Sequence, residues 1–383
     1  MGCRAVVSLV IETGEFSIST VHSSMVPSAP DRGTQPRRIL CIGEMWLGSD
    51  ARAAFTALQR LGHCIQVLDE YTYFPQWKRR WARGNRRLLT PLCVEELARD
   101  AIHAVDSFRP HCLFVFKGQY VAPKIVAYCN RQGISTINYY PDVSFRTHGM
   151  YIQRTLPLYR MVFNTKSFGV VDMKQQLGLT RVEFVEHGFD PELHRPVTLA
   201  PDERKMYECD LAFIGAWSPK KEAILTELHR GAPEINIKIW GPHWPAGGEL
   251  QSCITGRIVI GEQYTKAICG SKICLGLLSE IRRGASSGDL ITARTFQIPA
   301  CGVLMMHERN EEALRYFTED VEVAYFDGAR ELIEKARHYL SNAEKREAVA
   351  RQGWDRCNRE HRIDERMSVL LASVLRSSDD GTE

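Results

Sequence analysis

The sequence has no long hydrophobic run and no large excess of charge of one sign. No segment approaches the ~20 consecutive apolar residues that span a bilayer, so we expect no transmembrane segment. The formal net charge is +3 over 383 residues, which does not indicate a nucleic-acid-binding protein. A hydrophobic fraction of 44% and a charged fraction of 25% are typical of a globular protein.

Several motifs that carry well-defined chemistry are also missing. The 12 cysteines include no CxxC pair and no Cys/His spacing of a zinc site, so we expect no metal. Reduced and mostly buried thiols in a cytoplasmic protein are the expectation. No GxSxG, Walker A or HExxH pattern supports a serine hydrolase, an ATPase or a zinc enzyme. The turn from Gly43 to Gly48 is not GxGxxG, so a nicotinamide dinucleotide is not predicted.

Alternating strands and helices fill most of the chain. Apolar strands at 38–42 and 64–69 flank a helix, and this βαβ pattern predicts a parallel sheet with right-handed crossovers. A second series starts at Cys209, and the length exceeds the ~250–300 residues at which one core usually divides. We predict an α/β fold of two doubly wound Rossmann-like domains facing each other across a cleft. The predicted parts are a disordered lead-in (1–36), an N-terminal domain (37–190), a C-terminal domain (191–345), and a C-terminal helix with a tail (346–383).

Within this plan, strands are also expected at 158–164 and 258–260. The C-terminal stretch 343–375 is expected to be mainly helical, with breaks near Gly353 and His361.

The segment from Gly288 to Gly302 is a polar turn, a short helix and a Pro-Ala-Cys-Gly break before an apolar strand. A helix N-terminus presents unpaired N–H groups and a partial positive charge, which suits a phosphate. Arg294 would add a charge-assisted contact to the same anion, and Asp289 lies in the turn before the helix. The segment predicts an anion-binding helix start, with an ordinary helix-to-strand connection as the alternative.

A second helix start follows the strand that begins at Cys209. Gly215 ends that strand, and Lys220 and Lys221 lie in the first turn of the next helix. Backbone N–H groups and a lysine at this point would bind a diphosphate, whereas a solvated basic pair is the alternative. Two such helix starts in one domain indicate an anion site more strongly than either alone.

Three residues of the first half are candidates for acid–base chemistry. Glu44 and Asp142 each follow a strand, at the edge where open parallel sheets bind ligands, so each is a candidate general base. The alternatives are a solvent-facing carboxylate for Glu44 and a turn cap for Asp142. His187 lies at the proposed domain junction, where it would reach the cleft or make a structural hydrogen bond.

Basic and aromatic residues are interleaved from Trp77 to Arg87. Such a stretch would contact an anionic acceptor, a nucleic-acid strand or a membrane surface, with a solvated basic loop as the alternative. Nothing else in the sequence favours nucleic acid, so we do not expect that partner. A peripheral contact with a membrane surface stays open.

From Cys209 to the C-terminal helix the sequence resembles the CgeB-type (spore maturation protein) glycosyltransferases, a branch of the group 1 transferases with the GT-B fold. The matching motifs are Phe213-Ile214-Gly215-Ala216-Trp217, Ile239-Trp240-Gly241 and Asp289 to Gly302. The junction His187-Gly188-Phe189-Asp190 is similar as well. The resemblance covers about residues 38–375 and is more specific in the second half.

The resemblance implies transfer of a sugar from a nucleoside-diphosphate donor to an unidentified acceptor, without a cofactor or a bound metal. The implied donor-binding residues are Gly215, Lys220, Lys221, Asp289, Arg294 and Gln297, of which Arg294 matches the family's arginine directly. Glu44, Asp142 and the stretch 77–87 would face the acceptor.

Gln297 departs from the resembled pattern, because the family usually has Glu there. Related group 1 enzymes carry a second Glu eight residues further on, where this chain has Met305. An amide keeps the hydrogen-bonding capacity but loses the charge. This departure motivates a second hypothesis, a catalytically inactive sugar-nucleotide-binding or scaffold protein of the same fold. A nucleotide-sugar epimerase on the same two-domain plan is a third.

Overall fold

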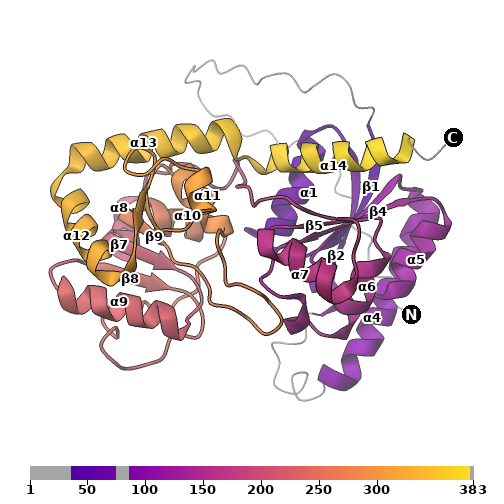
Figure 1. The fold of residues 1–383 in the computed structure, drawn as a ribbon, viewed down its shortest axis with the longest axis horizontal. Coiled ribbons are helices and arrows are strands. Elements are labelled where there is room, and N and C mark those ends of the chain that lie inside the picture. Colours follow the sequence, from indigo (N-terminus) through magenta and orange to yellow (C-terminus); the bar gives the residue numbers. More distant parts are fainter. Residues whose placement is uncertain (1–35, 75–85, 380–383) are drawn as a thin grey trace.

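The structure is a computed structural model that describes residues 36–74 and 86–379 (Figure 1). The expected lead-in, except Pro36, and most of the stretch from Trp77 to Arg87 lie outside the described residues, so those predictions stay predictions.

The first half of the chain forms a six-stranded parallel sheet in the order β2-β1-β3-β4-β5-β6. Its strands are β1 (Arg38–Gly43), β2 (Cys64–Asp69), β3 (Cys112–Phe116), β4 (Ser135–Tyr140), β5 (Met161–Asn164) and β6 (Val182–Phe184). Its helices are α1 (Asp50–Arg60), α2 (Glu70–Tyr73), α4 (Arg86–Phe108), α5 (Pro123–Arg131), α6 (Met150–Thr155) and α7 (Ser167–Leu177), with short 3-10 turns η2 (Phe145–Thr147) and η3 (Leu156–Leu158).

The second half forms a five-stranded parallel sheet in the order β11-β10-β9-β7-β8. Its strands are β7 (Cys209–Ile214), β8 (Ile237–Trp240), β9 (Ser271–Gly276), β10 (Leu304–Glu308) and β11 (Ala324–Phe326). Its helices are α8 (Pro201–Tyr207), α9 (Pro219–Gly231), α10 (Glu262–Cys269), α11 (Ala293–Ala300), η4 (Ala313–Arg315), α12 (Gly328–Ser341) and α13 (Ala343–Glu360). The predicted fold class, two doubly wound parallel sheets, is confirmed.

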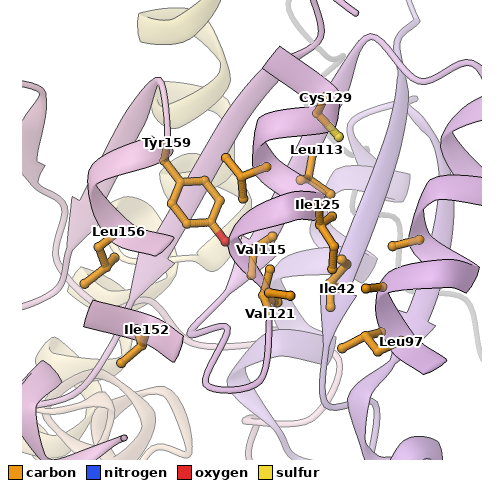
Figure 2. Packing of buried hydrophobic residues seen from close by; sticks show 14 of the residues in the cluster. Ile42, Leu97, Leu113, Val115, Val121, Ile125, Cys129, Ile152, Leu156 and Tyr159 are labelled. Carbon is orange, nitrogen blue, oxygen red and sulfur yellow. The ribbon is translucent and has the colours of Figure 1, made fainter. Parts of the chain in front are cut away.

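Both faces of the first sheet are buried at its central strand β3, which explains why β3 is continuously apolar. All five residues of β3 are buried. On one face, Leu113 and Val115 pack with Ile125 of α5 and Leu97 of α4 (Figure 2). On the other face, Phe114 packs with α1 and α14.

The last helix, α14 (Ile363–Asp379), returns to the first domain and lies beside α1 (Figure 1). Its Ile363 and Met367 join the first-domain core that contains Phe55 of α1. The chain crosses between domains where Phe189 N donates to His361 O at 3.1 Å and Ile363 N donates to Phe189 O at 3.0 Å. Both ends of the second domain are thus tied to the first.

Three expected elements differ in the structure. Residues 258–260 form no strand, and the exposed Ile258 and Ile260 belong to the loop before α10. The strand expected at 158–164 begins only at Met161, because Pro157 supports the 3-10 turn η3 before it. Gly353 does not break α13, which ends as expected before His361. A Cβ on Gly353 would lie 2.3 Å from Glu322 O, so this glycine permits close packing.

The strand order reverses at one point in each sheet, between β1 and β3 and between β7 and β9. Ligands of open α/β sheets bind in the crevice at the carboxyl ends of the strands beside such a point.

Candidate functional site

A buried lysine lies at the reversal point of the second sheet. Lys221, in the first turn of α9, is only 4% exposed. Its Nζ donates to Ala216 O at 3.3 Å and to Ser279 Oγ at 3.4 Å, and within the described residues it forms no ion pair. Burial and the positive charge of Arg294 lower the pKa of Lys221 to about 8.

The neighbouring Lys220 is already paired. Its Nζ forms an ion pair with Glu308 at the end of β10. Its backbone N–H donates to Glu280 Oε1 at 3.0 Å, so a carboxylate already occupies one N–H group at the start of α9. Of the two lysines predicted to bind the donor, Lys221 therefore keeps more capacity for an added anion.

Arg294 completes a pair of cations at this site. Its Nη2 donates to Leu277 O at 3.0 Å, and its guanidinium carbon lies 5.8 Å from the ring centre of Phe213. Its buried Nε has no partner among the described residues. Because the charge of Arg294 lowers the pKa of Lys221, an anion placed between them would relieve repulsion and supply both with a partner.

Gly215 allows the backbone to pass close to Phe213 and Arg294. A Cβ there would lie 2.8 Å from the Phe213 ring and 3.4 Å from Arg294 Nη1. The carbonyl of Gly215 accepts from Trp244 Nε1 at 3.0 Å. Gly241 packs against the same carbonyl so closely that a Cβ on it would lie 2.1 Å from the oxygen. The matching glycines Gly215 and Gly241 thus permit close backbone packing next to Arg294.

Residues 277–292, which join β9 to α11 and are called the bridging loop below, extend to the first domain (Figure 1). Lys166, which follows β5, is 4% exposed. Its Nζ lies 2.6 Å from Asp289 Oδ1 and donates to Ile291 O at 2.8 Å. The predicted donor residue Asp289 therefore makes an ion pair between the domains.

Three more hydrogen bonds hold the bridging loop on the first domain. They run from Ser144 Oγ to Arg283 O at 2.7 Å, from Gln176 Nε2 to Gly284 O at 2.8 Å, and from Ser286 N to Asp172 Oδ2 at 2.9 Å. The start of α11 is thus positioned by both domains.

Gln297 lies on the same face of α11 as Arg294 and touches the first domain. Its Oε1 accepts from Tyr264 OH at 2.8 Å, and its Nε2 donates to Asp50 Oδ1 at 3.4 Å. The amide therefore accepts one hydrogen bond and donates another, whereas an ionised carboxylate can only accept.

Asp50 is a functional candidate that the sequence reasoning missed. It is the first residue of α1, after the N-cap Ser49, and this pattern reads simply as a helix start. Burial and the charge of Asp142 raise the pKa of Asp50 to about 6, although Lys166 and Arg294 act in the opposite direction. A narrow cavity where the chain crosses between the domains is lined by Asp50, Tyr139, His187 and Asp190, among others.

His187 lies in this cavity and is 5% exposed. Its Nε2 is 3.4 Å from Lys166 Nζ. Burial and the charges of Lys166 and Arg294 lower the pKa of His187 well below its ordinary value. The imidazole is therefore neutral near pH 7 and is placed to accept a hydrogen bond from Lys166.

Asp142 lies at the end of β4 in a network of charged groups. Its Oδ2 is 2.9 Å from Lys117 Nζ and 3.4 Å from His148 Nε2, and His148 Nδ1 is 2.8 Å from Tyr140 OH. Burial alone would raise the pKa of Asp142, but Lys117 and His148 together hold it below its ordinary value. Asp142 is thus ionised and is a weak base.

Glu44 is exposed, and its Oε2 accepts from Trp46 Nε1 at 2.7 Å. A second carboxyl that sequence reasoning missed, Glu70, is buried after β2. Burial and the charge of Glu44 raise the pKa of Glu70 to about 8, so it is mainly protonated near pH 7. Lys117 was also not singled out in the sequence. Its φ of 61° is unusual for a residue other than glycine.

None of the helices in the described part of the chain has the length and apolar character of a membrane span. Over residues 36–74 and 86–379, no group of three or more His, Cys, Asp or Glu side chains is arranged to hold a metal ion. The described cysteines are all free, and Cys64 is exposed although it belongs to an apolar strand.

Residues 220–372 match the family model described as glycosyl transferase-like. A comparison with curated proteins gives no significant match. Among solved structures, a glycosyltransferase from Rickettsia africae is similar, with a TM-score of 0.60 and 10% identity over 91% of this chain and 100% of the other. Sucrose-phosphate synthase from Thermosynechococcus elongatus has a TM-score of 0.56 and 12% identity over 89% and 100%.

The Anabaena protein HepE in complex with UDP-glucose gives a TM-score of 0.56 and 11% identity, over 88% of this chain and 100% of that one. Identities this low show a shared fold alone. The chain therefore has the two-domain GT-B fold, and its second domain matches the glycosyl transferase-like family.

Proposed function

We propose that the protein is a glycosyltransferase of the CgeB type that moves a sugar from a nucleoside-diphosphate donor to an acceptor, without a bound metal. The observation that carries the proposal is the pair formed by Lys221 and Arg294. The two cations face the reversal point of the second sheet, and in the described part of the chain neither forms an ion pair with a carboxylate.

The chemistry of transfer agrees with this arrangement. The leaving nucleoside diphosphate gains negative charge as the glycosidic bond breaks, and preorganised cations stabilise that charge. HepE was solved in complex with UDP-glucose, which makes UDP and UDP-glucose the first probes for this chain. The bridging loop would close the donor site against the first domain, where Glu44 and Asp142 face the acceptor.

A thermal-shift series tests the donor site. Wild type, Arg294→Ala and Lys221→Met would be screened with UDP, other nucleoside diphosphates and their glucose conjugates, with and without magnesium. A ligand that binds the folded state raises the melting temperature. Losing one charge-assisted contact, worth about 1.5–3 kcal/mol, should weaken binding about 10- to 150-fold.

Lys220→Met is the matched control, because Lys220 is one residue away and is already paired with Glu308. It should retain most of the shift. Equal losses of the shift in all three variants, or no shift in well-folded wild type, would contradict the proposed site. Binding without turnover of any conjugate would favour the second hypothesis, an inactive sugar-nucleotide-binding protein.

A further inference from the structure

We propose that Asp50 is the catalytic base of this protein, and that its carboxylate accepts the proton of the acceptor hydroxyl as the sugar is transferred. The inference rests on the proposed glycosyl transfer. It assigns the step to a residue that the sequence motifs did not single out.

The fold places Asp50 against the helix that carries the donor cation. The side chain of Asp50 meets Gln297 Nε2 at 3.4 Å, across the junction between the domains. Gln297 follows Arg294 by three residues, so the two side chains share a face of α11 and are about 4.5 Å apart along its axis. A diphosphate at Arg294 would therefore direct the attached sugar toward the edge of the first domain where Asp50 lies.

Charged groups reach Asp50 from both domains and give it a suitable affinity for a proton. Burial and Asp142 raise its pKa to about 6, and Lys166 and Arg294 limit the rise. The cavity beside it is also lined by His187, Asp190 and His194. Burial lowers the pKa of both histidines, so they stay neutral while Asp50 titrates. A base with a pKa near the working pH is largely ionised yet still accepts a proton readily.

The bases predicted from sequence are less well placed. Asp142 pairs with Lys117 at 2.9 Å and has a lowered pKa. Glu44 is exposed and accepts from the Trp46 indole. His187 has a lysine ammonium 3.4 Å from its Nε2, which opposes the gain of a proton.

The step balances without any further reactant. The bond between the anomeric carbon and the diphosphate oxygen breaks, and its electron pair leaves with the nucleoside diphosphate. The acceptor oxygen bonds to the anomeric carbon, and its proton passes to Asp50 and then to solvent. With water as the acceptor, the products are free sugar, nucleoside diphosphate and one proton.

The test is the pH–rate profile of donor hydrolysis, with water as the acceptor. UDP-glucose is the first donor, followed by the glucose conjugates of any other nucleotide that binds. Wild type should lose rate below about pH 6, where Asp50 becomes protonated. Asp50→Asn keeps the shape and the oxygen that accepts from Gln297, so it should fold and bind UDP as wild type does. Its hydrolysis rate should fall about 10²- to 10⁴-fold, and its acid limb should disappear.

Asp142→Asn provides the comparison. It removes a charge that raises the pKa of Asp50, so the acid limb should persist but move to lower pH. An Asp50→Asn enzyme that keeps its rate and acid limb, or an Asp142→Asn enzyme that loses the limb, would overturn the base assignment and leave the proposed function intact. Wild type that binds no nucleotide would overturn both the base assignment and the proposed function. Wild type that binds a nucleotide but hydrolyses no conjugate would also overturn both, and the binding measurement distinguishes this outcome from the first.

Discussion

Gln297→Glu is the substitution that most directly tests the contact between the domains. The new carboxylate would keep an acceptor for Tyr264 OH but would face Asp50, where the amide now donates at 3.4 Å. Two outcomes compete: both carboxylates stay ionised and repel each other, or the pair takes up a proton and shares it.

The magnitudes decide between these outcomes. Two ionised carboxylates at about 3.4 Å would repel by about 5 kcal/mol at an effective dielectric constant of about 20. Protonating Asp50 from a pKa of about 6 costs less, about 0.1 kcal/mol at pH 5, about 1.4 at pH 7 and about 2.7 at pH 8. Proton uptake should therefore occur. Because this raises a carboxyl pKa in the folded state, the loss of stability is small at low pH and grows as the pH rises.

Melting temperatures of the variant and wild type at pH 5, 7 and 8 measure this effect. The difference should be near zero at pH 5 and reach about 3 °C at pH 8, because the shift is about the free-energy loss divided by an unfolding entropy of about 0.8 kcal/mol/K for 383 residues. Gln297→Met loses both hydrogen bonds without adding charge, so its cost should change much less with pH. In Asp50→Asn/Gln297→Glu, the new amide can donate to the new carboxylate, and the pH dependence should vanish. An equal loss at pH 5 and pH 8 in Gln297→Glu, or a pH dependence that survives in the double variant, would refute the reasoning.

Three further expectations follow from the same geometry. Lys166→Met should destabilise the protein by about 3–5 kcal/mol, because it leaves Asp289 buried and unpaired, and Lys166→Met/Asp289→Asn should recover part of this in denaturant titrations. Nucleotide affinity measured by calorimetry should fall as the pH rises through about 8, where Lys221 loses its charge, and a flat profile would argue against Lys221 as a ligand. Gly241→Ala should cost more than about 3 kcal/mol in the same titrations, whereas Gly247→Ala, also at positive φ but in open space, should cost less than half as much.

The fold could be predicted from the sequence because its signals are local. Apolar strands such as β3 and β7 are bounded by turn residues, and the alternation with helices specifies parallel sheets. The loop at 258–260 misled the prediction because its two exposed isoleucines look like strand residues when burial is unknown. The predicted helix break near Gly353 was wrong, because a glycine inside a helix can permit close packing without ending the helix.

The candidate site was only partly predictable, because its key properties depend on contacts between distant segments. The motif around Arg294 could be recognised, and in the structure the charge of this arginine lowers the pKa of Lys221. Nothing in the neighbouring sequence distinguishes Lys221 from Lys220, whose partner Glu308 is 88 residues away. The sequence around Asp50 indicates only the start of a helix. The raised pKa of Asp50 arises from burial and from the charge of Asp142 in another loop.

The bridging loop couples ligand affinity at the cationic site to the separation of the two domains. Moving the domains apart requires either breaking the pair of Lys166 and Asp289 or pulling the loop away from the start of α11. A ligand that binds better when the loop is seated must, by linkage, hold the domains together by the same free energy. Under the proposed function, the first domain would therefore contribute to nucleotide affinity by seating the loop, and a second domain expressed alone should bind nucleotide more weakly even with every cation in place.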